Sequence, residues 1–213
     1  MPMLTPTSLR RLRTTGPGIS ALAIAMTTVA APTSPAPNGP FERREADWRN
    51  GAIVYQVIVD RFVPSAHLEA KLAAHELDFW GGDLRSLATR LDHVQALGAT
   101  VLYLNPIHLA YTNHKYDAFD FKAISPEYGT TSDFRQMAAD MHRRGMKLVL
   151  DGVFNHMGRN APKFQDAIAN PRSPWRDWFV IGPQYAGGAR VWTGFQNLPE
   201  LNLENPAVRA HLW

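Results

Sequence analysis

Residues 147–154 read KLVLDGVF, an apolar run rich in β-forming residues. Two similar runs precede it, AIVYQVIVD at residues 52–60 and TVLYLNPI at residues 100–107. The three runs recur at nearly regular intervals, with enough chain between them for a long loop, a helix and a short return. This arrangement predicts a βαβαβ unit.

Helical patterns occupy both intervals. In the first, Asp83 is the expected N-cap and Gly98 the expected end, and the apolar residues at helical spacing are Leu84, Leu87, Leu91, Val94 and Leu97. The second pattern begins near Thr131 and Ser132 and stops at Gly145, with Phe134, Met137, Ala138 and Met141 on one face. The long connections follow the strands, so variable loops are expected at the strands' carboxyl ends. An α/β barrel and a doubly wound sheet both fit.

The first 31 residues have the pattern of a secretory signal peptide, a basic stretch through Arg13 followed by an apolar run from Ile19 to Ala31. That run is about 13 residues long, whereas a membrane-spanning helix needs roughly 20, so no stable membrane anchor is expected. Residues 32–50 are predicted to form a Pro-rich linker. We therefore expect a secreted or periplasmic protein.

The composition narrows the class of protein. Hydrophobic residues make up 45% of the chain and charged residues 19%, which is typical of a globular domain and argues against a fibre or a disordered tail. The formal net charge of +3 is small, and Arg10, Arg11 and Arg13 of the leader supply part of it. No nucleic-acid partner is predicted, and the oligomeric state stays open.

Five tracts, in order, resemble the α-amylase family of glycoside hydrolases, glycoside hydrolase family 13. They are VYQVIVDRF, FWGGDLRSLATRLDHVQALGATVLYLNPI, NHKYDAFDFKAISPEYGTTSDF, DGVFNH at residues 151–156 and LPELN at residues 198–202. The resemblance implies an α/β fold, an incomplete (β/α)8 TIM barrel with a small domain inserted after strand three. Residues 51–157 would form the first half of the barrel, residues 158–203 the inserted domain, and residues 204–213 the truncated start of the third barrel helix. From the residues alone, Asn205 is the expected N-cap of that last helix, and its apolar stripe, Val208 and Leu212, is expected to pack against a sheet.

The chemistry implied by this family needs two carboxylates. One attacks the anomeric carbon, and the other, about 5–5.5 Å away, protonates the departing oxygen and later activates water. The resemblance assigns both roles to later strands, beyond Trp213, so no residue of this chain is predicted to be catalytic. We therefore expect an N-terminal fragment that is inactive alone.

The resemblance implies four substrate-binding side chains, those of His114, Tyr116, Asp117 and His156. Tyr116 would stack on a pyranose face, Asp117 would accept hydrogen bonds from hydroxyls, and His156 would donate one that strengthens as charge builds in the transition state. Judged from the residues alone, core packing is the alternative for Tyr116 and His156. Asp151 would support the site by holding an Arg.

Calcium is the one cofactor that the resemblance suggests, and no organic cofactor is expected. Asn155 matches a position whose side-chain oxygen binds structural Ca²⁺ in many members, and Glu200 stands where a second ligand is often Asp. Trp80, Trp175, Trp178 and Trp192 are suited to stacking on glucose rings, but packing is the favoured interpretation, and none is predicted as a site residue.

Three functions are consistent with the sequence. The leading one is a fragment of a secreted retaining hydrolase that acts on starch, maltooligosaccharide or cyclodextrin. The second is a fragment of a transglycosylase or isomerase of the same superfamily, and the third is a non-catalytic carbohydrate-binding or interaction protein. NHKYD together with LPELN favours the neopullulanase and cyclomaltodextrinase side of the family.

Overall fold

The computed structural model describes residues 39–64 and 79–212, so the predicted signal peptide lies outside the described residues. The helices and strands are α1 (Pro40–Glu45), β1 (Val54–Val57), α2 (Val59–Phe62), α4 (Leu84–Ala88), α5 (Leu91–Ala96), β2 (Val101–Leu104), β3 (His108–Ala110), β4 (Ala118–Ile124), α6 (Thr131–Arg143), β5 (Lys147–Leu150), α7 (Pro162–Ala169) and α8 (Pro206–Leu212). Short 3₁₀ turns, η1 (Pro126–Tyr128) among them, connect several of these. Helix α1 lies within the predicted linker.

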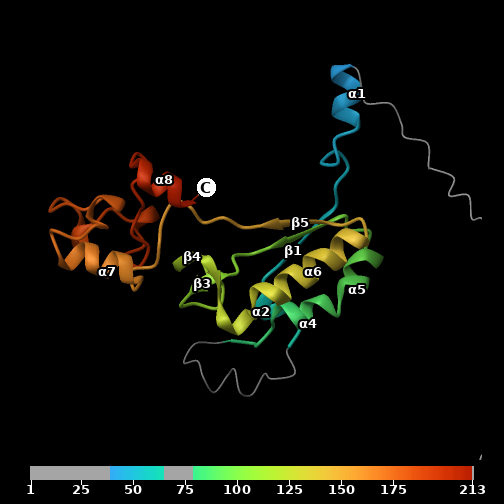
Figure 1. Cartoon of the computed structure of the whole chain (residues 1–213), viewed down its shortest axis with the longest axis horizontal. Coiled ribbons are helices and arrows are strands. Elements are labelled where there is room, and N and C mark those ends of the chain that lie inside the picture. Colours follow the sequence, from blue (N-terminus) through green and yellow to red (C-terminus); the bar gives the residue numbers. More distant parts are fainter. Residues whose placement is uncertain (1–38, 65–78, 213) are drawn as a thin grey trace, which may run out of the picture.

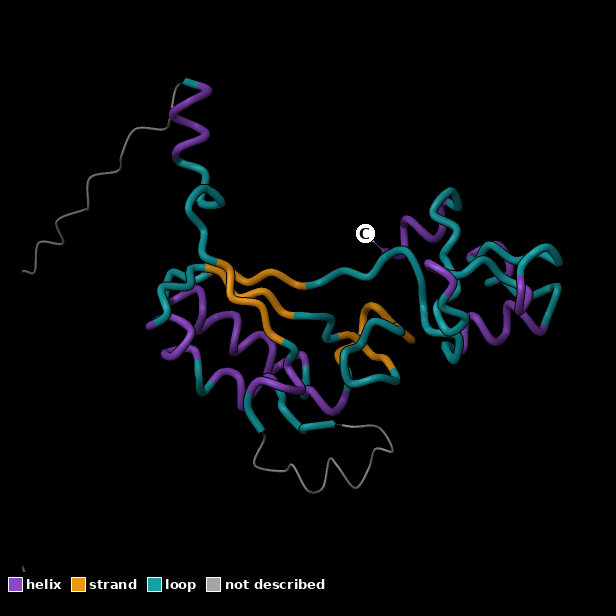
Figure 2. Tube along the Cα trace, turned by 180° about the vertical axis from the view of Figure 1, so that it is seen from behind, coloured by secondary structure: helices purple, strands orange, loops and turns teal. Residues whose placement is uncertain are grey.

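Three parallel strands form the first sheet, in the order β1-β2-β5 (Figure 2). Their register aligns Val54 with Val101 and Val101 with Lys147. The βαβαβ prediction is therefore confirmed, although each strand is four residues long and shorter than the apolar run that predicted it.

Helices α4, α5 and α6 cover one face of this sheet (Figure 1). Asp83 caps α4, since its carboxylate accepts a hydrogen bond from the Ser86 amide at 2.7 Å. The first predicted helix is divided, because Arg90 has a non-helical ψ of 12° and the Thr89 hydroxyl donates to the Ser86 carbonyl at 2.7 Å. Gly98 and Gly145 have φ of +79° and +73°, the left-handed conformation that ends helices.

The core between the sheet and these helices consists of buried hydrophobic side chains. Its largest members with no more than 1% exposure include Leu84, Leu87, Leu91, Leu102, Leu104, Met137, Met141 and Tyr128. This packing fixes where the strands end, and so where the loops that follow them begin.

An antiparallel hairpin, β3 with β4, follows β2 and was not predicted. Its register shifts twice, on either side of Leu109, so His108 faces Ile124 and Ala110 faces Ala118. The turn between the two strands carries the NHKYD tract. The hairpin therefore projects this tract beyond the end of the sheet.

Residues 155–201 form a second lobe with its own core, which is visible around α7 in Figure 1. The chain enters and leaves this lobe side by side: the Leu201 amide donates to the Asn155 carbonyl at 2.9 Å, and the Arg159 amide donates to the Asn197 carbonyl at 2.7 Å. Helix α8 begins after Asn205, whose side chain accepts from the Ala207 amide at 2.9 Å, as the sequence predicts for an N-cap.

Helix α8 packs differently from the expectation that its apolar stripe covers a sheet. Val208 is completely buried in the second core, and the His211 ring lies 5.1 Å from the Trp178 ring. The helix therefore closes the second lobe. Across the described ranges, no helix combines the length and the apolar character needed to cross a membrane.

Candidate functional site

A pocket of about 490 Å³ lies where the HKYD turn, the end of β5 and the second lobe meet. It is lined by His114, Tyr116, Asp151, Gly152, Val153, Asn155, His156, Trp192, Phe195, Asn197 and Leu198. Five of the six predicted site residues are thus brought together from two separate tracts. The volume is within the range of small-molecule sites.

Tyr116 is tied to the sheet through its hydroxyl. That hydroxyl donates to Asp151 Oδ2 at 2.7 Å and accepts from Asn105 Nδ2 at 3.2 Å. Burial and the neighbouring Asp151 carboxylate raise the pKa of Tyr116, so the phenol stays protonated and acts as a donor. Asp151 therefore supports the site through Tyr116, and its predicted contact with an Arg stays a prediction.

His156 is 2% exposed, and both of its ring nitrogens are occupied. Nε2 lies 2.9 Å from the Tyr116 carbonyl oxygen, which can only accept, so Nε2 carries the proton; Nδ1 lies 2.6 Å from the Asn155 amide nitrogen and accepts. Burial lowers the pKa of His156, which keeps the ring neutral at neutral pH. A sugar hydroxyl would have to replace one of these partners, and sugar binding by His156 stays a prediction.

Asp117 is not among the described residues that line the pocket. It is 6% exposed and accepts hydrogen bonds from the Thr112 amide at 3.2 and 3.3 Å and from the Thr112 hydroxyl. This carboxylate closes the turn that carries His114 and Tyr116. His114 is exposed beside Tyr116, with ring centroids 5.7 Å apart.

The residues expected to bind calcium do not assemble a complete site. The Asn155 amide nitrogen is directed to His156, and the Glu200 carboxylate accepts a hydrogen bond from Arg190 Nε at 2.5 Å. Within the described part of the chain, no three His, Asp or Glu side chains gather as a metal site. Hard cations need more oxygen ligands than this arrangement supplies, so calcium stays a prediction.

Trp192 and Phe195 also line the pocket. The sequence suggested stacking for Trp192 but favoured packing, and it gave no indication of Phe195. Trp192 is 42% exposed and lies 5.3 Å from the His156 ring, and Phe195 stacks on Trp192 at 5.9 Å with an interplanar angle of 22°. The packing interpretation of Trp192 is therefore incomplete. No local pattern carried this signal, because the second lobe's fold alone brings these rings to His156.

Comparison with known proteins decides the family. Residues 56–213 match the family described as alpha amylase, catalytic domain, which is most of the chain. The chain belongs to the α-amylase family. The motif resemblance is thereby confirmed, and the β1-β2-β5 order with helices on one face corresponds to the first units of a (β/α)8 barrel.

This α-amylase-family chain is similar to several named proteins. It is 35% identical over 177 residues to the intracellular maltogenic amylase of Bacillus subtilis and 34% identical over 184 residues to neopullulanase 2 of Thermoactinomyces vulgaris. Each alignment covers 78% of this chain but only 30% and 31% of those proteins. The chain therefore spans about a third of the length of these relatives. Their names confirm the prediction that the chain lies on the neopullulanase and cyclomaltodextrinase side of the family.

A solved structure gives the same picture. The cyclic alpha-maltosyl-(1→6)-maltose hydrolase from Arthrobacter globiformis, in complex with maltose, superposes with a TM-score of 0.70 at 34% sequence identity. The match covers 78% of this chain and 41% of that chain. The chain therefore shares its fold with the corresponding part of that structure.

Proposed function

We propose that this chain binds glucosyl residues of an α-glucan in the pocket at Tyr116 and His156, as the substrate-binding part of a glycoside hydrolase. One observation carries the proposal: Tyr116, Asp151 and His156, from two distant tracts, converge with hydrogen bonds of 2.7 and 2.9 Å in a pocket beside exposed aromatic rings. Aromatic faces pack on the C–H face of a pyranose, and polar side chains bind its hydroxyls.

Hydrolysis is proposed over transfer or isomerisation because the relatives carry hydrolase names, amylase, neopullulanase and cyclomaltodextrinase. Among the described residues that line the pocket, Asp151 is the one carboxylate. Retaining hydrolysis takes two carboxylates about 5–5.5 Å apart. We therefore expect the 213-residue chain to bind α-glucan without releasing reducing sugar.

Calorimetric titration tests this function. The chain should bind maltotriose and should not bind cellobiose, whose glucosyl units are β-linked. Tyr116→Ala should weaken maltotriose binding about tenfold, which corresponds to one lost stacking contact. Tyr111→Ala is the matched control, because Tyr111 is 47% exposed on the same turn and does not line the pocket. Equal binding of the two sugars, or none of either, would refute the proposal.

Reducing-sugar and product assays separate the other functions. Release of reducing sugar from starch or cyclodextrin by the purified chain would contradict the expected inactivity. Longer oligosaccharides formed from maltotriose would favour the transglycosylase, and binding without any product is the result expected here.

We also propose export, on the leader pattern of residues 1–31. The B. subtilis relative is named intracellular, so the two proteins would differ in compartment. N-terminal sequencing of the protein from culture supernatant and periplasm should find a start after Ala30 or Ala31. An uncleaved protein confined to the cytoplasm would contradict export.

A further inference from the structure

Lys115 stands between two pocket residues but points away from the pocket. Its side chain is completely buried, a rare situation for a lysine. The ammonium pairs with the carboxylate of Glu127, which is itself only 10% exposed. The rings of Phe79 and Tyr128 lie 5.0 and 5.1 Å from the Lys115 nitrogen. Burial of a charge is costly unless it is compensated. Glu127, the two rings and the Ala110 carbonyl oxygen, which accepts a hydrogen bond from the Lys115 nitrogen at 3.4 Å, compensate it here.

The backbone at Lys115 is in the left-handed region, with φ of +64°. Side chains other than glycine rarely adopt this conformation, and it persists where surrounding contacts impose it. At this position it turns the lysine inward while His114 and Tyr116, on either side, line the pocket. The same backbone turn therefore buries the side chain of Lys115 and directs the side chains of His114 and Tyr116 to the pocket.

A second contact ties the same turn to the same element. The Tyr128 hydroxyl donates to the Asn113 carbonyl, so residues 113 and 115 are both held by η1. The turn is thus clamped at two points to the segment that leads into α6. The buried ion pair fixes one of those points.

Two atoms of Tyr116 form hydrogen bonds with other residues of the pocket. Its hydroxyl binds Asp151 at 2.7 Å, and its carbonyl oxygen binds His156 Nε2 at 2.9 Å. A shift of the backbone at residues 115–116 would therefore move the Tyr116 ring and the hydrogen bond that orients His156 together.

We propose that the Lys115–Glu127 ion pair is a positioning device that holds Tyr116, and through it His156, in the geometry that binds a glucosyl residue. This inference rests on the proposed function. Lys115 touches no substrate and acts through Tyr116.

A double-mutant cycle on the full chain tests this role. Lys115→Met combined with Glu127→Gln removes both charges together and so leaves no buried charge without its partner; the fold should therefore be retained. This double variant should bind maltotriose about tenfold more weakly than the unmodified chain at a temperature well below its unfolding midpoint. In a Tyr116→Ala background the same two changes should cost clearly less affinity than in the unmodified chain, because the ring is already lost and only the carbonyl contact of residue 116 with His156 remains to be disturbed.

Lys122→Met is the control, since Lys122 is an exposed lysine on β4, in the same hairpin. It should leave maltotriose affinity unchanged. Normal affinity of the double variant would overturn the inference while the proposed function stands. An equal loss in both backgrounds would also overturn it, because a general loss of structure does not depend on Tyr116. Failure of the unmodified chain to bind maltotriose would refute the proposed function and this inference with it.

Discussion

Individual side chains in the pocket owe their state to burial more than to charge. Burial lowers the pKa of His156 and raises the pKa of Tyr116, and both shifts favour the neutral side chain. Apart from the Asp151 carboxylate, which binds the Tyr116 hydroxyl, the described polar residues that line the pocket are of types without a formal charge or held neutral, which suits a neutral ligand such as a sugar. The aromatic rings of Trp192 and Phe195 extend this surface outward, because exposure rises from His156 at 2% to Trp192 at 42% and Phe195 at 55%.

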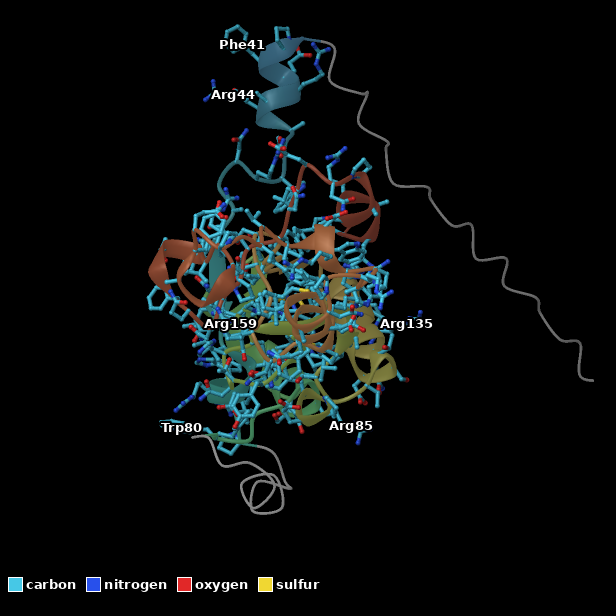
Figure 3. The ribbon with its side chains drawn as sticks, turned by 90° about the vertical axis from the view of Figure 1, so that its left-hand side faces the viewer. Phe41, Arg44, Trp80, Arg85, Arg135 and Arg159 are labelled. Carbon is cyan, nitrogen blue, oxygen red and sulfur yellow. The ribbon has the colours of Figure 1, made fainter. Side chains whose placement is uncertain are left out.

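Removing the outer rings should therefore reduce affinity for longer ligands most. Trp192→Ala and Phe195→Ala should each weaken maltotriose binding by about twofold to tenfold, with a smaller effect on glucose, as each ring offers one stacking face. Trp80→Ala is the matched control, because Trp80 is 53% exposed and is not among the residues that line the pocket. Figure 3 shows Trp80 at the end of the molecule opposite α1. Isothermal titration with glucose, maltose and maltotriose measures the effect. A loss that is equal for all three sugars would contradict it.

His108 predicts a pH dependence of stability. Its ring is 7% exposed, and burial lowers its pKa below 6.5, although the Lys115 backbone and the carboxylates of Asp117 and Asp151 oppose the shift. The unfolded chain takes up a proton at about pH 6.5 that the folded chain does not, so the free energy of unfolding should be constant above about pH 7 and fall below pH 6.5. Urea unfolding between pH 5 and 8 measures this. His108→Phe, which keeps the edge contact with Phe121, should reduce the slope; an unchanged slope would contradict the assignment.

Secondary-structure elements were predictable where local chemistry decides them. The three β-runs, the caps Asp83 and Asn205 and the terminal glycines Gly98 and Gly145 all appear in the structure as the sequence indicates. The β3–β4 hairpin was missed, because β3 has three residues and its register shifts twice, which leaves no periodic pattern. The pocket was predictable only in part, since Trp192 and Phe195 reach His156 through the fold of the second lobe.

Gly82 marks a close crossing of two elements. A Cβ at this position would lie 2.1 Å from the Val59 carbonyl oxygen, while the Gly82 amide donates to the Asp60 carbonyl at 2.9 Å. Gly82→Ala should lower the free energy of unfolding by about 1–3 kcal/mol, because backbone must move to admit the methyl group. Gly39→Ala is the control, since no atom there lies closer than 3.9 Å. Thermal unfolding of the two variants measures the difference. Equal unfolding midpoints would show that the backbone at Gly82 admits a methyl group without cost.

At the scale of the whole molecule, the helices among residues 39–64 and 79–212 that pack on the parallel sheet, α4, α5 and α6, lie on one of its faces (Figure 1). Within the described residues, β1 and β5 each pair with β2 alone, and large apolar side chains remain exposed in these strands and just before β1. These are Ile53, Val54 and Leu150, with 54%, 55% and 47% exposure. Unpaired, apolar strand edges template association between chains.

The 213-residue chain should therefore self-associate as its concentration rises. Val54→Lys should shift the association to higher concentration, because a charge on an edge strand opposes pairing. Phe41→Lys is the control: Phe41 is 78% exposed but lies on α1, away from the sheet (Figure 3). Size-exclusion chromatography with light scattering measures the mass. Identical behaviour of the unmodified chain and Val54→Lys would exclude association through this edge.

The two ends of the second lobe are hydrogen-bonded to each other, and this has a consequence for how the ligand preference of the pocket can change. Because residues 155–159 lie against residues 197–201, the segment between them is a cassette whose two ends are already joined. Doubling the length of such a loop costs only about 0.6 kcal/mol of closure entropy. Exchange of the cassette would replace Trp192 and Phe195 while His156, Tyr116 and the sheet beneath them stay in place. Ligand preference can thus change by substitution of one continuous segment, independently of the parallel sheet.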